Sequence, residues 1–292
     1  MIIKGKFPWY APDKLMSESA KSLFNILPSI KELPHLPTSV MELQQLIQNP
    51  STSSNNLALV AKKDPMIATN ILKIANNIKS SENVAIESLA HAISYIGFKI
   101  LNEIVIAASV TSFEFKTTIF KAEDFWEESF LVGKIAEFLG RKLNPKLVPD
   151  ELYLAGALCN IGKVVLAICF PELADKIVKD SMDIKILSSW RQGEALHEAS
   201  DHCILGEIAA SLWGLPQYVL FAAGNHHKLN QSSDDHQEKT NIVALANQFA
   251  HWVRLEPNKI DQILLTKLAK EFGLHKKEVE NIADHLIGTF AA

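Results

Sequence analysis

Two stretches of this chain repeat apolar residues at the spacing of a helix face. The residues concerned are Ile67, Ile71, Ile74 and Ile78 in the first stretch, and Leu89, Ile93, Ile96 and Ile100 in the second. Steps of three and four residues place side chains on one side of an α-helix, where they can pack into a core. Strand signals are weak, because alternation is absent and the Asn-Gly dipeptide of a tight hairpin does not occur. We therefore predict an all-α, multi-helical fold.

Prolines are spread unevenly along the chain. They are frequent up to Pro65 and then absent until Pro145. Proline lacks an N–H and restricts the residue before it, so each early proline can begin or end a short helix. We predict short helices first and longer helices from about Met66 onward. Asp64 and Pro65 together are interpreted as a turn followed by a helix start.

Three segments depart from the helical pattern. Residues 111–124 lose clean periodicity, and we expect them to join two helical lobes, residues 21–115 and residues 120–292. Residues 228–240 are polar and rich in turn-forming residues, which predicts an exposed loop. Residues 1–20 are expected to form an irregular lead-in.

Composition narrows the classes of function. The 292 residues are 48% apolar and 21% charged, and the net charge is −4, so a basic face for nucleic acid is not expected. The three cysteines lack the spacing of a metal finger, and their odd number suits a reducing compartment. The longest apolar stretch, residues 155–170, is interrupted by Asn160 and Lys163, so we expect no membrane span. Lys4 and Lys6 are not followed by a continuous apolar segment, which argues against a secretory signal. We expect a cytoplasmic protein.

A series of short motifs adds a family resemblance to this pattern. In chain order they are Leu33–Pro37, Asn49–Pro50, Lys63–Pro65, Ala75–Asn77, Ile86–Leu89, Ala92–Ile93, Ile96–Gly97, Phe125–Ser129, Ala155–Leu158, Ile161–Lys163, Trp213–Pro216 and His226–His227. Their order and spacing resemble the HDOD family, the HD-related output domain of bacterial signalling proteins, from about Leu27 to the C-terminus. The resemblance implies an HDOD-specific helical bundle (residues 21–115) packed on a degenerate HD-type helical bundle (residues 120–292).

Several single residues have a local interpretation within such a fold. Gly97 and Gly162 would let helices approach closely, because glycine has no Cβ. Pro216 fits the end of one helix and the start of the next. Trp126 and Trp213 are interpreted as core anchors.

The resemblance also implies where an HD-type metal site would lie. Such a site needs imidazoles and carboxylates around divalent cations that acidify a bound water. At the matching positions this chain carries Glu128, Cys159, Asn160 and Asn247. A thiol and two neutral amides replace most of the charged and imidazole ligands, although Glu128 could still bind a hard cation. We therefore predict no catalytic residues, no bound metal and no cofactor, and we interpret Cys159 as a buried small hydrophobic residue.

Four further residues are candidates for ligand binding, and the three histidines among them lie where related metal hydrolases carry further histidines. His202, His226 and His227 are interpreted as partly exposed histidines at helix ends that hydrogen-bond to the backbone, and the alternative is an altered metal site. Lys163 is interpreted as a solvated lysine at a helix turn, and the alternative is a contact to a phosphate. All four are retained as residual ligand-binding candidates.

Three functions remain open. The first, which the resemblance favours, is a non-enzymatic signalling or regulatory module that binds a protein partner in a bacterial pathway. The second is a divergent metal-dependent phosphohydrolase acting on nucleotides or cyclic dinucleotides. The third is a pocket for a nucleotide-like small ligand that is not turned over.

Overall fold

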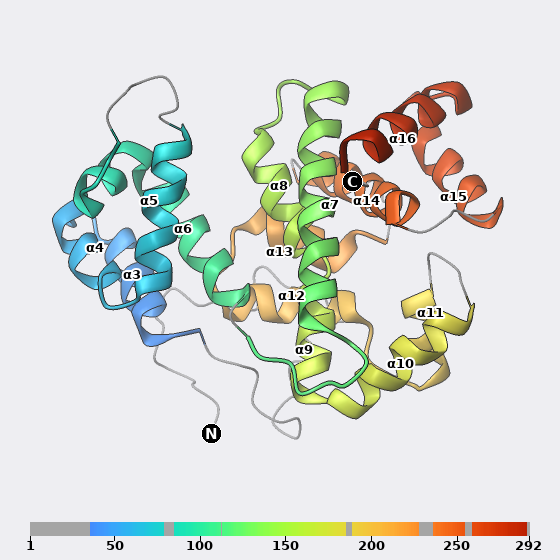
Figure 1. The fold of residues 1–292 in the computed structure, drawn as a ribbon, viewed down its shortest axis with the longest axis horizontal. Coiled ribbons are helices and arrows are strands. Elements are labelled where there is room, and N and C mark those ends of the chain that lie inside the picture. The colour runs from blue at the N-terminus through green and yellow to red at the C-terminus, as the bar shows by residue number, and fades with distance from the viewer. Residues whose placement is uncertain are drawn as a thin grey trace. The chain divides into compact units, whose positions relative to one another are not determined.

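The computed structural model describes residues 36–78, 85–111, 113–184, 189–227, 236–254 and 259–290. Within these ranges every regular element is a helix and no strand occurs, so the predicted all-α fold is confirmed (Figure 1). The chain divides into two compact units, one of residues 34–113 and one that includes everything from Glu114 onward. The predicted lead-in, residues 1–20, lies outside the described residues. The assignment of residues 21–115 and 120–292 to separate lobes remains our proposal.

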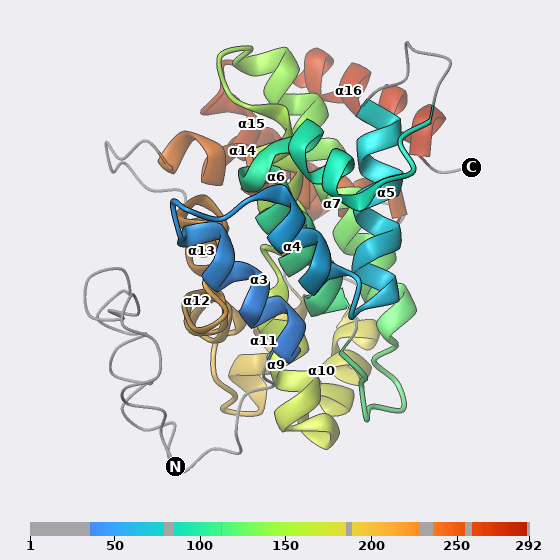
Figure 2. The ribbon, with the colours of Figure 1, turned by 90° about the vertical axis from the view of Figure 1, so that its left-hand side faces the viewer.

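The unit of residues 34–113 contains four helices around one apolar interior (Figure 2). The longest helix packs against each of the other three. The core contains Leu43, Leu57, Ile67, Ile71, Ile93 and Leu101, so residues of both apolar repeats of the sequence face inward as predicted. The helices are α3 (Thr38–Gln48), α4 (Ser54–Ala61), α5 (Pro65–Ile78) and α6 (Leu89–Thr111).

Capping side chains explain where two of these helices begin. Ser53 and Asn56 form a reciprocal capping box at the start of α4, which satisfies backbone N–H groups that lack helical partners. At the start of α5 the Asp64 carboxylate accepts a hydrogen bond from the N–H of Ile67, and Pro65 is the first helical residue. The predicted turn and helix start at Asp64 and Pro65 is therefore confirmed.

Gly97 has a different role from the one predicted. A Cβ at this position would meet no atom within 4 Å, so no helix approaches closely there. Its φ of +79° instead kinks α6, in a backbone conformation that side-chain-bearing residues adopt with strain. The expectation of close helix packing at Gly97 was wrong, because the glycine is needed for the backbone angle.

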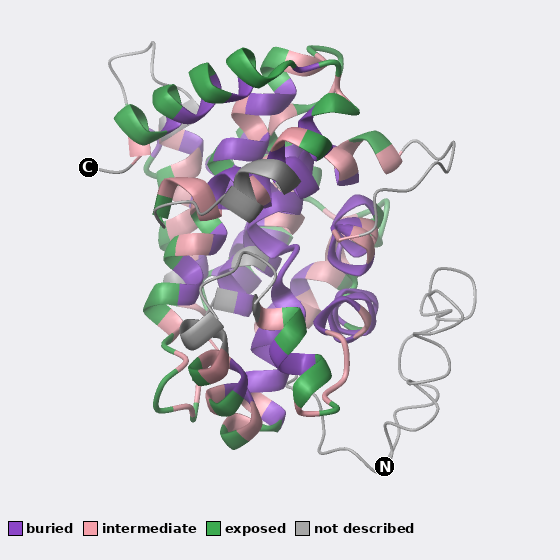
Figure 3. Cartoon of the chain, turned by 90° about the vertical axis from the view of Figure 1, so that its right-hand side faces the viewer, coloured by how far each residue is buried: buried purple, intermediate pink, exposed green. Residues whose placement is uncertain are grey.

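The second unit is built around a long helix, α7, that packs along α8 and α14 (Figure 1). Helix α12 packs on α9 and α13, and α10 packs on α9 and α11. Helices α8, α9, α12 and α13 are buried over most of their length, whereas α7 and α16 carry both buried and exposed residues (Figure 3). The helices are α7 (Ala122–Leu143), α8 (Pro149–Leu158), α9 (Ile161–Cys169), α10 (Pro171–Ile184), α11 (Ser189–Leu196), α12 (His202–Leu212), α13 (Gln217–Asn225), α14 (Gln237–Arg254), α15 (Lys259–Lys270) and α16 (Lys276–Phe290).

Gly162 lets α9 lie directly against α12. A Cβ on Gly162 would stand 1.8 Å from the carbonyl oxygen of His202 and 2.7 Å from the N atom of Gly206. Both atoms belong to the backbone and cannot rotate away, so the predicted close approach at Gly162 is confirmed. The contact fixes the start of α9 against the first turn of α12, where several of the predicted site residues lie.

Other local predictions met different outcomes. Pro216 precedes α13 directly, and Trp126 and Trp213 are buried, as expected.

The exposed loop predicted for residues 228–240 was wrong in its last part, because α14 begins at Gln237 and Thr240 is 1% exposed. Thr240 is buried because the apolar face of α14 packs into the core. Residues 228–235 lie outside the described part of the chain.

In the part of the chain that the structure describes, two helical stretches are long and apolar enough to cross a membrane by length and composition alone. They are residues 89–110 and residues 149–169. The second spans α8 and α9, and 83% of it is buried inside the protein, as in the core of a globular fold. Burial against other helices explains its apolar character without a lipid environment.

Candidate functional site

The four positions matched to the HD-type site belong to helices that meet in the second unit. Cys159 and Asn160 form the break between α8 and α9, while Asn247 lies on α14 and Glu128 on α7. The Nδ2 atom of Asn160 donates a hydrogen bond to Oδ1 of Asn247 at 3.0 Å. Both amides are buried, at 4% and 2% exposure. The Oδ1 atom of Asn160 is buried without a hydrogen-bond partner in the described part of the chain.

Cys159 is fully buried and behaves as the small hydrophobic residue predicted from the sequence. Burial raises the pKa of its thiol to about 12, and the charge of Lys163 only partly opposes this effect. A thiol is a poor metal ligand until it loses its proton. Cys159 therefore adds neither charge nor a ready ligand to this region.

Glu128 supplies a carboxylate, and cationic groups surround it. Its Oε1 atom lies 3.7 Å from Nδ1 of His251, one turn after Asn247 on α14. Burial raises the pKa of Glu128, but the charges of His251 and Lys163 outweigh burial and hold the pKa below its ordinary value. The carboxylate is thus ionised, and protein cations lie close to it.

These donors do not fit the dinuclear cation site of an HD-type hydrolase. One carboxylate, one thiol and two neutral amides give too little negative charge for two divalent cations. The buried Oδ1 atom of Asn160 is one neutral acceptor, and Asn247 already occupies the other end of the same amide. We therefore assign no metal-dependent step to these four residues.

Lys163 is buried, contrary to the solvated lysine predicted from the sequence. It is only 8% exposed, because the first turn of α9 is enclosed by the helices around it. Its ammonium nitrogen lies 5.2 Å from the centre of the Trp190 ring, a cation–π contact. Lys163 is therefore an interior cation of the site.

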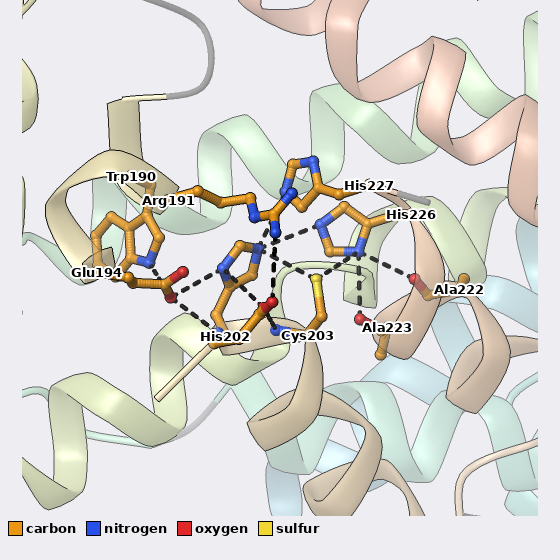
Figure 4. A network of polar contacts seen from close by, with 10 residues as sticks. Trp190, Arg191, Glu194, His202, Cys203, Ala222, Ala223, His226 and His227 are labelled. Atoms are coloured by element: carbon orange, nitrogen blue, oxygen red, sulfur yellow. Dashed lines mark hydrogen bonds and ion pairs between the residues drawn. The ribbon is translucent and has the colours of Figure 1, made fainter. Parts of the chain in front are cut away.

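Three histidines come together beside this region (Figure 4). The Nε2 atom of His202, the first residue of α12, lies 3.3 Å from Nε2 of His226 and 3.2 Å from Nε2 of His227. His226 and His227 follow the last residue of α13. The Sγ atom of Cys203 lies 3.8 Å from the same Nε2 atom of His202. We call these four residues the histidine cluster.

The predicted exposure of the histidines was wrong for two of them. His202 is completely buried and His226 is 2% exposed, while His227 is intermediate. The expected backbone hydrogen bond is present at His226, whose Nδ1 lies 3.0 Å from the carbonyl oxygen of Ala222. The two helix ends are buried because α12 packs on both α9 and α13.

Burial also affects the protonation of the cluster. It lowers the pKa of His226 to about 4, and it lowers the pKa values of His202 and His227 strongly as well. The positive charge of Lys163 acts in the same direction on all three histidines. Burial and the charge of Lys163 therefore both favour the uncharged form of the three imidazoles.

Glu194 on α11 holds His202 in place. One carboxylate oxygen, Oε1, accepts the backbone N–H of His202 at 2.8 Å and the Trp190 indole N–H at 2.9 Å. The same oxygen lies 2.9 Å from Nδ1 of His202. Burial raises the pKa of Glu194 to about 7, although these hydrogen bonds oppose the rise.

Sequence reasoning missed Glu194, Trp190 and His251. A recognisable signal existed for His251, which stands four residues after Asn247 and so shares its helix face. Trp190 and Glu194 show the same spacing on α11, but nothing in the sequence connects that helix with His202. Only the packed fold brings the three residues to the site.

Within the described residues, the second unit is a helical domain in which two histidines of the cluster are buried. The model of the HDOD domain matches residues 33–229, and the chain therefore belongs to the HDOD domain family. The match spans the histidine cluster and all the degenerate positions except Asn247.

Solved structures share the fold at low identity. An HDOD domain protein of unknown function from Geobacter sulfurreducens is 20% identical, with a TM-score of 0.67, over 93% of this chain and 95% of the other. A candidate phosphohydrolase from Shewanella amazonensis SB2B is 22% identical, with a TM-score of 0.63, over 91% of this chain and 98% of that protein. At these identities the likeness establishes the fold alone.

A curated relative is longer than this chain. An uncharacterised protein of Treponema pallidum (strain Nichols) is 21% identical over 234 residues, which are 80% of this chain. The chain spans about half the length of that relative, 45% of it.

Proposed function

We propose that this chain is a non-enzymatic regulatory module of a bacterial signalling pathway, acting in the cytoplasm by binding a protein partner. The observation that carries the proposal is the hydrogen bond between Asn160 and Asn247. It joins two neutral amides at positions where the family resemblance places metal-binding groups. Membership of the HDOD family supports the same interpretation, because the family resemblance is to output domains of signalling proteins.

The physical argument concerns the nucleophile of phosphoester hydrolysis. An HD-type enzyme needs a metal-bound water that is acidified to near neutral pH. Cys159 retains its proton, Asn160 and Asn247 carry no charge, and Glu128 is balanced by nearby cations. These residues therefore lack the negative charge that would hold a cation able to acidify a bound water.

A hydrolysis assay tests the loss of catalysis. Purified chain is incubated with a generic phosphodiester and with cyclic dinucleotides, in the presence of Mn²⁺, Mg²⁺, Fe²⁺ or Zn²⁺. We expect no turnover above that of the His202→Ala/His226→Ala variant. Turnover by the unmodified chain that this variant lacks would establish the alternative, a divergent metal-dependent phosphohydrolase, and overturn the proposal.

A second experiment tests the binding role. The full chain is cross-linked to its neighbours at native expression level, and each captured protein is then purified and titrated against the purified chain. We expect one protein that binds with a dissociation constant below about 10 µM, a value typical of signalling contacts. Binding of a cyclic dinucleotide in equilibrium dialysis, with no protein confirmed by titration, would instead support a small-ligand sensor.

A further inference from the structure

The histidine cluster contains a conflict between hydrogen-bond acceptors. His226 places Nδ1 3.0 Å and 3.2 Å from the carbonyl oxygens of Ala222 and Ala223, so Nδ1 must carry the proton. In a neutral imidazole this leaves Nε2 as a bare acceptor. The Nε2 atom of His226 points at Nε2 of His202 from 3.3 Å (Figure 4).

His202 has the same tautomer for a different reason. Its Nδ1 lies 2.9 Å from Oε1 of Glu194, an oxygen that also accepts two N–H groups and therefore acts as an acceptor. The proton of His202 is thus on Nδ1, and its Nε2 is a second bare acceptor. Two buried lone pairs face one another with no proton between them. A proton on Nε2 of His227, 3.2 Å from His202, could satisfy only one of the two.

We propose that His202, His226, His227 and Cys203 form a closed, tetrahedral binding site for one Zn²⁺ ion. A cation placed among the Nε2 atoms converts the opposed lone pairs into metal bonds. Each of the two tautomers is already the one that such a bond requires. Burial raises the pKa of the Cys203 thiol, so Cys203 would release its proton when the ion binds. The four residues offer ligand atoms that all lie within 4.8 Å of one another, and no ion is present among them.

Two of the distances between the nitrogen atoms, both measured from His202, match tetrahedral zinc. With Zn–N bonds of about 2.05 Å, two nitrogens at tetrahedral positions are about 3.3 Å apart. The observed separations from His202 are 3.3 Å to His226 and 3.2 Å to His227. With a Zn–S bond of about 2.3 Å, sulfur and nitrogen would be about 3.6 Å apart, and Sγ of Cys203 lies 3.8 Å from His202.

Groups behind the ligands complete the arrangement. Metal-bound histidines commonly donate their other ring N–H to a carboxylate or a backbone carbonyl, which fixes the ring and raises its basicity. Glu194 does this for His202, and the carbonyl of Ala222 does it for His226. Glu194 and Asp201 also offset the unfavourable charge of Lys163, although Arg191 lies 3.6 Å from the Asp201 carboxylate.

A site with four protein ligands has no open position for water, which is the property of a structural zinc site. Such an ion would tie the start of α12 to the end of α13 without supplying hydrolysis. The inference departs from the expectation, drawn from the sequence, that this chain binds no metal. It does not depend on the proposed function, because it is tested by metal binding and not by turnover.

The test uses the full chain after removal of bound metal by chelation. Zn²⁺ is titrated in competition with a chromophoric chelator, and Co²⁺ is used as a spectroscopic probe of geometry. We expect one equivalent of Zn²⁺ bound with a dissociation constant below about 1 µM. We also expect Co²⁺ to give the visible bands of tetrahedral coordination and a thiolate-to-metal band in the near ultraviolet.

Variants locate the site. His227→Gln and Cys203→Ser each remove a metal ligand and should each weaken Zn²⁺ binding by more than about 100-fold. Loss of a residue that only hydrogen-bonds to a ligand costs up to roughly 100-fold. Glu194→Gln should weaken it by about 10- to 100-fold. The exposed His91 provides the control, and His91→Gln should bind Zn²⁺ as the unmodified chain does.

Two results overturn the proposal. One is failure of the unmodified chain to bind stoichiometric Zn²⁺, which would mean that the histidines form a metal-free hydrogen-bonded stack. The other is unchanged affinity in both ligand variants, which would place any bound zinc elsewhere. If a variant does not fold, as judged by circular dichroism, the cobalt spectrum of the unmodified chain decides, and absence of the thiolate band removes Cys203 from the site.

Discussion

Asn160 on the α8–α9 break and Asn247 on α14 are joined by a hydrogen bond of 3.0 Å, although 87 residues separate them in the chain. The bond connects the two helical segments that would each contribute an acidic ligand in an HD-type site. Here the same positions hold the helices together through neutral groups. The interaction is therefore consistent with our proposal that the positions which the family resemblance assigns to metal ligands serve packing in this chain.

Placing carboxylates at both positions should show that the two amides stabilise the packing of these helices. In the Asn160→Asp/Asn247→Asp variant two carboxylates would face each other in a buried site, where both cannot ionise without cost. We expect a loss of about 2–4 kcal/mol in the free energy of unfolding at pH 8, measured by urea denaturation. The loss should shrink at pH 5, because a shared proton raises the pKa of one carboxyl group.

The same variant tests the position of these residues relative to one another. Millimolar Mn²⁺ should recover part of the lost stability, since a divalent cation can lie between paired carboxylates. Asn55→Asp, at an exposed position on α4, adds a charge without burial and should change stability little. Equal effects of the buried double change and the exposed single change would contradict the predicted contact.

The sequence predicted the helical architecture because apolar periodicity is a local property. The repeats at Ile67 and Ile71 and at Ile93 and Ile96 are read within single helices, and tertiary packing then buries them. Gly97 shows where such reasoning stops. A glycine in an apolar helix suggests either a close approach or an unusual backbone angle, and only the structure distinguishes the two.

The candidate site was only partly predictable for the same reason. Motif order led to Cys159, Asn160 and His202, but their burial depends on which helices cover them. Lys163 was expected in solvent, because lysine is seldom buried, yet the Trp190 ring lies beside its ammonium group. Glu194 comes from a helix that carries no motif, so no pattern in the sequence could assign it to His202.

Gly162→Ala should be strongly destabilising. The added methyl group would collide with backbone atoms of α12, which cannot move without separating the two helices. We expect a loss of about 3 kcal/mol or more in the free energy of unfolding, measured by thermal or chemical denaturation. As the matched control, Gly288→Ala adds the same methyl group to α16, where it meets nothing within 4 Å. That change should be neutral or stabilise the protein by up to about 1 kcal/mol.

The cysteines should resist modification in the native state. Cys159, Cys169 and Cys203 are all buried, and burial raises the pKa values of Cys159 and Cys203 above the ordinary range. Because thiolates and not thiols react with disulfide reagents, we expect almost no labelling at pH 8. Labelling should become complete in concentrated guanidinium chloride. Rapid reaction of Cys159 in the folded protein would mean that the α8–α9 break is open to solvent.

Asp175 on α10 provides a prediction about pH. Its carboxylate accepts hydrogen bonds from three consecutive backbone N–H groups, those of Thr118, Ile119 and Phe120, at 2.7, 2.8 and 3.0 Å. The Thr118 hydroxyl donates a further bond at 2.7 Å. Burial raises the pKa of Asp175 and is the largest single influence, but the four bonds together outweigh it and lower the pKa to about 2, from an ordinary value of 3.8.

Asp175→Asn should therefore destabilise the protein at neutral pH, because an amide can satisfy fewer of these donors. We expect a loss of about 1–2 kcal/mol, a value reduced from that of buried charged hydrogen bonds because Asp175 is partly exposed. A carboxyl group whose pKa is lowered by folding stabilises the native state above its unfolded pKa. The stability difference between variant and unmodified chain should thus be constant above about pH 5 and narrow as the pH falls from 3.8 toward 2. Urea denaturation at several pH values measures this difference in the free energy of unfolding.

Asp284→Asn, at an exposed position on α16, removes the same charge and serves as the control. A parallel pH profile for the two variants would show that net charge, and not the hydrogen bonds to residues 118–120, accounts for the effect.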